Sequence, residues 1–250
     1  MKQDIKTVKV ENLFKKFGGL QALWDVSFSV EKGERLVIIG PNGAGKTTLF
    51  NVITGEIPPT DGRVYLFGKD VTYLPPHRRT HLGMARTFQI TNLFPNLTLH
   101  ENILLAVVGV NHQRYKMHRP VTGCGDIIAK IEALINEWDL QEYKYTLVKN
   151  LSYGVQRQVE VIMALAGGSK LLLLDEPTSG LSPAETVAVT SMILHLDPEV
   201  TLLIIEHDMD VAFQLAHNMI VFHLGAVIAK GLVEEIKLNS KVKEIYLGEE

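Results

Sequence analysis

The 250-residue sequence predicts an α/β fold in which helices pack on a largely parallel sheet. Short β-rich segments alternate with helical ones along the chain, which is the pattern of such folds. Two unbroken apolar runs, Leu171–Leu174 and Leu202–Ile205, each end at a carboxylate. Runs of this kind are typical of central parallel strands whose carboxyl ends carry chemistry. Hydrophobic residues make up 46% of the chain, which is enough to bury a sizeable core.

The first part of the chain predicts strands that are parted by glycine-containing turns. Four strands are expected, at Thr7–Glu11, Val26–Val30, Glu34–Ile39 and Arg63–Phe67. The third of them leads into a glycine-rich loop, and the stretch KTTLFNVITG after this loop has helical character.

The middle of the chain changes to a mostly helical pattern, which predicts an inserted helical subdomain. Its clearest helices are expected at Asn102–Val108 and Ile127–Trp138. We therefore predict a single domain over residues 1–250, with a core at about 1–93 and 153–250 and a helical subdomain at about 94–152.

The last part of the chain returns to alternating strands and helices. Ser182 and Glu185 form a capping box around Pro183, so a helix is expected to begin there. After Asn218 the sequence predicts two short strands and a terminal helix.

Charge and cysteine content indicate which partners and which cellular compartment fit the chain. The chain carries 25 basic and 28 acidic residues, a net charge of −3, whereas dedicated nucleic-acid-binding proteins usually show a strong basic excess. We therefore expect no nucleic-acid partner. The single cysteine, Cys124, cannot form an internal disulfide, which favours a reducing cytosol. We interpret it as an inert thiol in a loop.

The sequence predicts neither a signal peptide nor a membrane-spanning helix. Its first residues, MKQDIKTVKVEN, lack a long apolar core. The longest apolar run, from Ile103 to Val110, falls short of the roughly 18–20 residues that span a bilayer. A membrane process would therefore need another chain to supply its membrane part.

A phosphate-binding loop is predicted at residues 40–47, where GPNGAGKT fits the pattern G-x-x-x-x-G-K-[ST]. Backbone N–H groups of such a loop converge on phosphate oxygens, and the helix that follows adds partial positive charge. The loop residues expected to contribute are Asn42, Gly43 and Gly45. A chance glycine-rich turn is the alternative, and the position between a predicted strand and a predicted helix disfavours it.

The side chains at the end of this loop predict nucleotide binding. Lys46 is expected to neutralise the β- and γ-phosphates, and Thr47 to place its hydroxyl on Mg²⁺. Thr48 follows and is expected to donate to the α-phosphate.

Two carboxylates follow the apolar run LLLL and predict hydrolysis. Asp175 is expected to hold Mg²⁺, and Glu176 to act as general base on the attacking water. An acidic strand end without chemistry is the alternative, which the phosphate-binding loop disfavours. A GTPase would normally show an N-K-x-D motif, and the sequence contains none.

With these motifs in this order, the chain resembles the ABC ATPase family. The motifs are GPNGAGKT (40–47), Gln89, LSYGV (151–155), LLLLDEP (171–177), SGLS (179–182) and His207. The resemblance covers essentially the whole chain. It implies a P-loop NTPase core with a mostly parallel sheet, an antiparallel β portion near the N-terminus and an inserted helical subdomain. It also implies ATP and Mg²⁺ as cofactors, in a head-to-tail dimer where each ATP lies between one subunit's P-loop and the other's LSYGV motif.

Three single residues take their expected roles from this resemblance. Phe17 in KKFGGLQAL looks like the family's adenine-stacking aromatic, with a core phenylalanine as the alternative. Gln89 in RTFQ resembles the glutamine that contacts Mg²⁺ and the attacking water and links the site to the transporter. His207 in LLIIEHD resembles the histidine that contacts the γ-phosphate, with a structural histidine as the alternative.

The motif LSYGV departs from the family's common LSGGQ. Ser152 and the Gly154 amide, at the amino end of a predicted helix, are expected to reach a γ-phosphate across the dimer. Tyr153 is a familiar replacement in some importer subfamilies. Val155 replaces an amide side chain with a β-branched one, which leaves open how strongly this face supports the partner's site.

Several longer stretches resemble the ATPases of branched-chain amino-acid importers and their relatives in urea importers. They are FGGLQAL, GKTTLFNVITG, ARTFQITNLFPNLTLHENI, LSYG and the terminal IYLGEE. The resemblance implies a peripheral subunit on the cytoplasmic face of the membrane, paired with a second ATPase subunit, either a related chain or a copy of itself. Two membrane permease subunits and an external solute-binding protein would complete the transporter. The surface formed by Gln89 and the apolar stretch Phe94–Asn102 is the predicted docking surface for the permease subunits.

Two other classes of function remain open. A non-transport ABC ATPase clamps nucleic acid or the ribosome, but such proteins usually carry two cassettes or a long coiled-coil insertion, whereas this chain has one P-loop. A regulatory module that binds nucleotide without turnover commonly loses one of the catalytic residues, and both Glu176 and His207 are present. Val155 keeps the regulatory interpretation open for the opposite half of a heterodimer.

Overall fold

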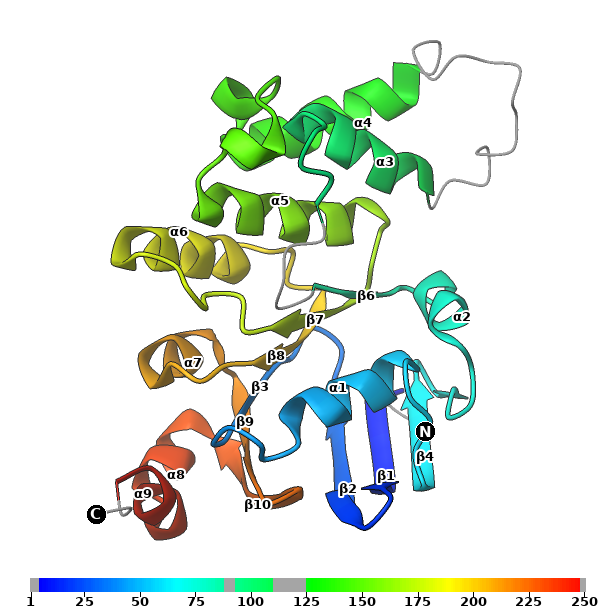
Figure 1. The fold of residues 1–250 in the computed structure, drawn as a ribbon, viewed down its shortest axis with the longest axis vertical. Helices are drawn as coiled ribbons and strands as arrows, with labels where there is room; N and C mark the ends of the chain where they lie inside the picture. The colour runs from blue at the N-terminus through cyan, green and yellow to red at the C-terminus, as the bar shows by residue number, and fades with distance from the viewer. Residues whose placement is uncertain (1–4, 88–92, 110–124, 248–250) are drawn as a thin grey trace. The chain divides into compact units, whose positions relative to one another are not determined.

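The structure is a computed structural model that describes residues 5–87, 93–109 and 125–247. Contacts divide the chain into two compact units (Figure 1). The first unit comprises Met1–Arg86, Lys170–Glu176 and Leu196–Glu250, and the second comprises Thr87–Ser169 and Pro177–His195.

A six-stranded sheet in the first unit confirms the predicted parallel core. Its strand order is β10-β9-β3-β8-β7-β6, and every neighbouring pair is parallel except β10 with β9. The strands are β3 (Arg35–Ile39), β6 (Met84–Arg86), β7 (Leu171–Asp175), β8 (Thr201–Ile205), β9 (Asn218–His223) and β10 (Ala226–Leu232). All residues of β7 and β8 are buried, as their unbroken apolar runs predict.

A second, four-stranded sheet is antiparallel, in the order β2-β1-β4-β5. Its strands are β1 (Val8–Phe17), β2 (Leu20–Val30), β4 (Asp61–Leu66) and β5 (Lys69–Asp70). The first two are longer than their predicted stretches, because their hydrogen bonding continues through a mixture of polar and apolar residues to a turn at Gly18 and Gly19.

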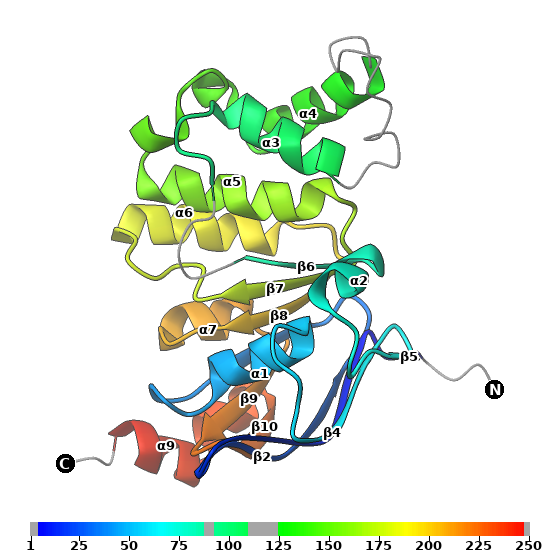
Figure 2. The ribbon, with the colours of Figure 1, turned by 45° about the vertical axis from the view of Figure 1, so that its right-hand side comes forward.

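The described residues of this unit form five helices, and α1 lies between its two sheets (Figures 1 and 2). The helices are α1 (Lys46–Thr54), α2 (Pro76–His81), α7 (Met209–Leu215), α8 (Val233–Leu238) and α9 (Ser240–Leu247). Leu49, Phe50 and Ile53 of α1 join residues of both sheets in one apolar core. The tail holds two helices rather than the one expected, since Asn239 ends α8 and accepts hydrogen bonds from the first turn of α9.

The carboxyl end of α1 is fixed by a buried arginine. The side chain of Arg79 is 1% exposed, and its guanidinium donates to the carbonyls of Val52 (2.8 Å) and Ile53 (2.7 Å) in the last turn of α1. It also donates to the carbonyls of Leu74 and Thr72. Helix ends leave such carbonyls without intrahelical partners, so Arg79 closes this end of α1. Burial lowers the pKa of Arg79 to about 10, which leaves it charged at neutral pH.

The second unit is helical. Its described part contains α3 (Leu99–Gly109), α4 (Gly125–Glu137), α5 (Tyr153–Ala166), α6 (Pro183–Leu194) and the short 3₁₀ helices η3 (Gln141–Tyr143) and η4 (Val148–Asn150). The division differs from the expected subdomain at 94–152, because α5 packs against both α3 and α6 and all three group together.

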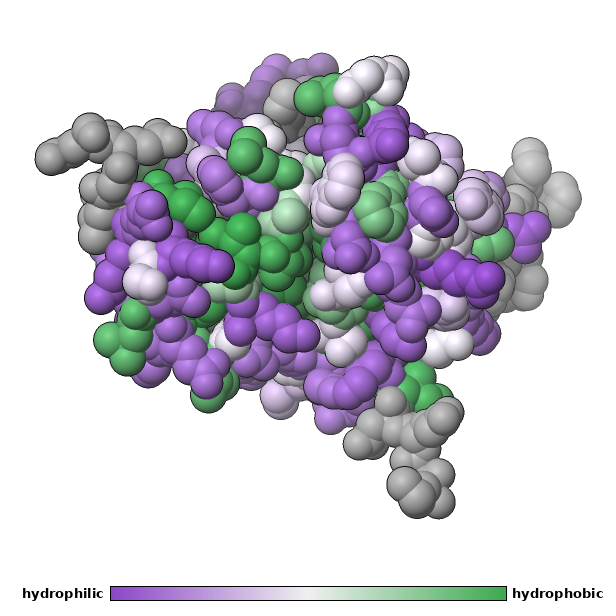
Figure 3. Space-filling model, turned by 90° about the horizontal axis from the view of Figure 1, so that it is seen from below, coloured by the Kyte–Doolittle hydropathy of each residue, from purple (hydrophilic) through white to green (hydrophobic). Residues whose placement is uncertain are grey.

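Among the described residues, no helix is both long and apolar enough to span a bilayer. Hydrophilic side chains cover most of the face drawn in Figure 3, and apolar ones gather chiefly in a hollow near its middle.

Candidate active site

The loop between β3 and α1 has a backbone that only glycine accommodates at two positions. Gly40 has φ 153° and Gly45 has φ 100°. A Cβ at Gly40 would lie 2.3 Å from the Phe222 carbonyl oxygen, and one at Gly45 would lie 2.6 Å from the Ala22 carbonyl oxygen. Gly45 is also the N-cap of α1 and offers no side chain to the helix end. The free N–H groups of the first turn therefore face the loop as an anion-binding concavity.

Lys46 points its ammonium group back into this loop. The side chain is 6% exposed, and Nζ donates to the carbonyls of Gly40 (2.5 Å) and Pro41 (3.0 Å). Burial lowers the pKa of Lys46, and the nearby charges of Glu176 and Asp175 oppose this effect. The ammonium group is thus largely desolvated and held within the loop.

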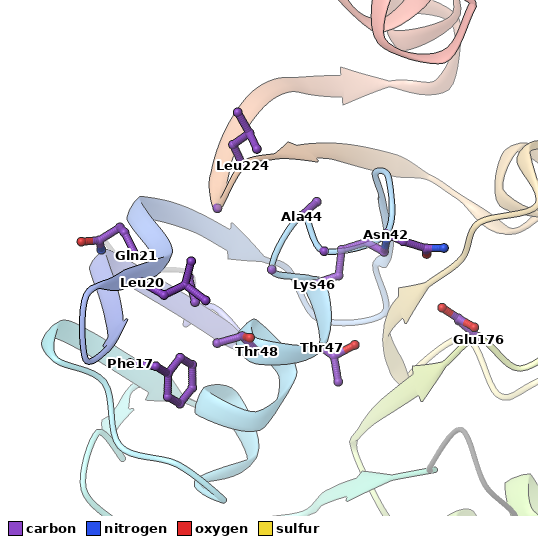
Figure 4. A pocket seen from close by; sticks show the side chains of 14 residues that line it. Phe17, Leu20, Gln21, Asn42, Ala44, Lys46, Thr47, Thr48, Glu176 and Leu224 are labelled. Carbon is purple, nitrogen blue, oxygen red and sulfur yellow. The ribbon is translucent and has the colours of Figure 1, made fainter. Parts of the chain in front are cut away.

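A pocket of about 370 Å³ opens over the loop (Figure 4). Asn42, Gly43, Gly45, Lys46, Thr47 and Thr48 line it, together with Phe17, Leu20, Leu224 and Glu176. Phe17 is 47% exposed, which excludes the alternative of a core phenylalanine. Phe17, Leu20 and Leu224 give the pocket an apolar side, whereas the loop and Glu176 give it a polar one.

Asp175 is the last residue of β7 and is paired with Arg86. The Arg86 Nη2 donates to Asp175 Oδ2 at 2.9 Å, and both side chains are nearly buried. Burial raises the pKa of Asp175, and the bond and charge of Arg86 oppose this rise. Arg86 also donates to Asn51 of α1 (2.7 Å) and pairs with Glu56 (3.1 Å). It therefore joins the carboxylate of β7 to the phosphate-loop helix.

Glu176 sits in a strained backbone conformation directly after β7. Its φ is 49°, in the left-handed region, and its N–H donates to the Ile205 carbonyl at 2.9 Å. A residue other than glycine in this region costs about 1–3 kcal/mol, and such outliers cluster at active sites. The conformation turns the carboxylate into the pocket (Figure 4).

His207 lies beside Glu176, at the end of the neighbouring strand β8. Its Nδ1 is 3.7 Å from Glu176 Oε2, and its side chain is 53% exposed. Asp208 caps α7 by accepting from the N–H groups of Asp210 and Val211, which ends the loop directly after His207. The structure thus brings both predicted catalytic side chains to one edge of the sheet.

The second unit places Ser152 and Gly154 at the start of α5, as predicted. Ser152 is the N-cap, and its hydroxyl accepts from the Val155 N–H at 3.4 Å. The Gly154 N–H donates to the carboxylate of Glu185, 2.9 Å away.

One predicted site residue, Gln89, lies outside the described residues, as does Cys124. The sequence did not predict the parts that Arg86, Arg79 and Glu185 play near the site. Arg86 pairs with Asp175, Arg79 holds the end of α1 and Glu185 accepts from Gly154. Only Glu185 had a local signal, the capping box, and that signal pointed to its own helix alone.

Comparisons with known proteins agree with the motifs. A family model described as ABC transporter matches residues 23–179. The probable branched-chain amino acid transport ATP-binding protein LivG of Archaeoglobus fulgidus is 36% identical over 250 residues, covering 98% of this chain and 96% of that protein. A solved nucleotide-free ATP-binding cassette from an ABC transporter has a TM-score of 0.85 at 32% identity, covering 98% of this chain and 100% of that one. A dimeric cassette in a post-hydrolysis state, bound to ADP and Pi, has a TM-score of 0.75 at 26% identity, covering 90% of this chain and 98% of that one.

Proposed function

Because this chain belongs to the ABC transporter family, we propose that it is the ATP-hydrolysing subunit of an importer for branched-chain amino acids. The similarity to LivG over nearly the full length of both proteins is the observation that carries the solute class. The enzyme activity is hydrolysis of ATP coupled to transport. A urea importer remains the alternative solute class, because nothing inside the ATPase touches the solute.

The pocket residues fit a nucleotide with its metal ion. Phe17 offers a half-exposed ring to a base, and the loop amides with Lys46 offer donors to phosphates. Thr47 and Asp175 supply a hydroxyl and a carboxylate, the hard oxygen ligands that Mg²⁺ takes alongside phosphate oxygens. Among the described residues no cluster of three or more acidic, histidine or cysteine side chains forms an all-protein metal cage. Mg²⁺, once bound, would neutralise charge on the β- and γ-phosphates.

The chain's own residues divide the hydrolytic work. Glu176 accepts the proton of the attacking water, since its carboxylate faces the pocket beside the phosphate loop. His207, within 3.7 Å of that carboxylate, is placed to contact the γ-phosphate and to orient the base. Gln89 is proposed to contact the metal and the water.

The transport assignment is tested by solute uptake. The chain, its partner ATPase and the two permease subunits are placed in proteoliposomes with the external binding protein. We expect ATP-dependent accumulation of labelled leucine, lost when Glu176→Gln replaces the native chain. Accumulation of labelled urea without leucine would establish the alternative. Uptake of neither, with an active ATPase, would contradict the importer assignment.

Docking to the permeases is proposed to use the loop around Phe94. The ring of Phe94 is 53% exposed, yet its backbone is fixed by the buried side chain of Asn102. Asn102 accepts from the Phe94 N–H (2.8 Å) and donates to the Phe94 and Thr98 carbonyls (3.2 and 2.9 Å). An apolar side chain held rigidly in water suits a preformed contact surface.

We expect Phe94→Asp to abolish co-purification with the permease subunits, because it places a charge in an apolar contact. The purified subunit should keep its fold and its ATP affinity. Leu238→Asp places the same charge at an exposed apolar residue on α8. It is the matched control and should co-purify normally. Normal assembly of the Phe94→Asp protein would refute the docking surface.

A further inference from the structure

The carboxylate of Glu185 binds the amino ends of two helices at once. On α6, its Oε2 accepts from the Ser182 N–H (3.1 Å) and the Ser182 hydroxyl (2.8 Å), which completes the capping box. Its Oε1 accepts from the Gly154 N–H in the first turn of α5 (2.9 Å), and the Ser152 side chain is a further hydrogen-bond partner. These bonds lower the pKa of Glu185 to about 2, so it is an anion at neutral pH.

Gly154 is shaped for this contact. A Cβ at this position would lie 2.6 Å from Glu185 Cγ and 2.9 Å from its Oε1. The φ of Gly154 is not among the positive values, so its backbone conformation does not require glycine. The absence of a side chain at residue 154 serves the close approach of an anion to the helix end.

We propose that the Glu185 carboxylate occupies, in the free subunit, the anion-binding site at the amino end of α5 that the partner's γ-phosphate takes in the ATP-bound dimer. The phosphate must then displace the carboxylate. This inference rests on the proposed function and on the head-to-tail dimer that the family resemblance implies, in which Ser152 and the Gly154 amide are expected to act on the partner's ATP. The donors assigned to that phosphate are the ones that Glu185 engages. One N–H cannot serve two anions at full strength, and two anions at one helix end repel each other.

Displacement links two parts of the same unit. When the phosphate takes the Gly154 N–H, the Glu185 side chain keeps only its bonds to Ser182, on the helix that follows the SGLS turn. Binding of the partner's ATP would thereby change the hydrogen bonding of Glu185 at the start of α6. In the free subunit the same carboxylate satisfies the Gly154 N–H of α5 and thereby opposes closure of the dimer.

The test measures ATP-driven dimerisation by sedimentation equilibrium in a Glu176→Gln background, which holds ATP unhydrolysed. We expect Glu185→Gln to tighten the ATP-bound dimer about tenfold, because an uncharged amide competes less well and repels the phosphate less. Glu235→Gln is the matched control: Glu235 accepts from the Leu232 N–H (2.9 Å) at the amino end of α8, and the change in net charge is the same. Its dimer should be no tighter than that of Glu176→Gln alone.

The outcomes separate the inference from the proposed function. If the Glu176→Gln protein dimerises with ATP and Glu185→Gln leaves the dimer unchanged or weaker, Glu185 is only a structural cap and the inference is overturned. Tightening by Glu235→Gln to the same extent would reduce the effect to net charge and overturn it too. If no variant dimerises with ATP, alone or with the partner ATPase, the in-trans site of the proposed function fails with it.

Discussion

The Glu176→Gln variant is expected to bind ATP with native affinity and to hydrolyse it roughly 10²–10⁴-fold more slowly, the usual contribution of a positioned general base. Glutamine has the same shape and can adopt the same left-handed backbone, so only the basic oxygen is lost. Because hydrolysis is blocked after ATP has bound, the variant should also accumulate as an ATP-bound dimer.

Two measurements check this expectation. Steady-state phosphate release gives the turnover, and calorimetry gives the ATP affinity. Glu199→Gln, at a glutamate whose side chain is 71% exposed, controls for the change of charge and should turn over normally. Turnover of the Glu176→Gln protein at the native rate would remove this residue from the role of base.

Replacement of Arg79 by methionine is expected to lower the free energy of unfolding by at least about 3 kcal/mol. The change removes the guanidinium donor from the carbonyls of Ile53, Thr72 and Leu74, whereas the Val52 carbonyl keeps the Gly55 N–H. Each buried group left without a partner costs about 1–3 kcal/mol. It also loosens the carboxyl end of α1, whose first residue is Lys46, so ATP affinity should fall as well.

Arg78→Met is the matched control, because Arg78 is the exposed neighbour of Arg79 on the same helix. Its effect on stability should stay within about 0.5 kcal/mol, as for most surface substitutions. Denaturant unfolding of the nucleotide-free proteins compares the two. Equal stabilities of the two variants would show that the buried guanidinium contributes nothing to the fold.

The parts of the fold that sequence predicted best are those with a local signal. The apolar runs Leu171–Leu174 and Leu202–Ile205 match β7 and β8 to within one residue, because a strand buried on both faces must be apolar throughout. The loop at residues 40–45 lies between a strand and a helix, as its glycines and lysine, which stand at fixed spacing in one short stretch, predict.

The buried arginines had no such signal. Arg79 and Arg86 look like ordinary surface residues in the sequence, since arginine is almost never fully buried unless paired. Their partners are distant: Arg86 meets Asp175 across 89 residues, and Arg79 meets Val52 across 27. The contact of Glu185 with Gly154 likewise depends on the packing of α5 against α6. The role of Gln89 stays a prediction.

The backbone conformation of Glu176 costs folding stability, while the side chain that it carries is needed for activity. Glycine at this position would release left-handed strain of about 1–3 kcal/mol, partly offset by the roughly 0.5–1 kcal/mol that glycine loses on folding. A screen for thermostable variants would therefore favour loss of the general base. Selection for heat resistance alone would turn a motor into an inert nucleotide-binding protein, so directed evolution of this chain needs turnover among its criteria.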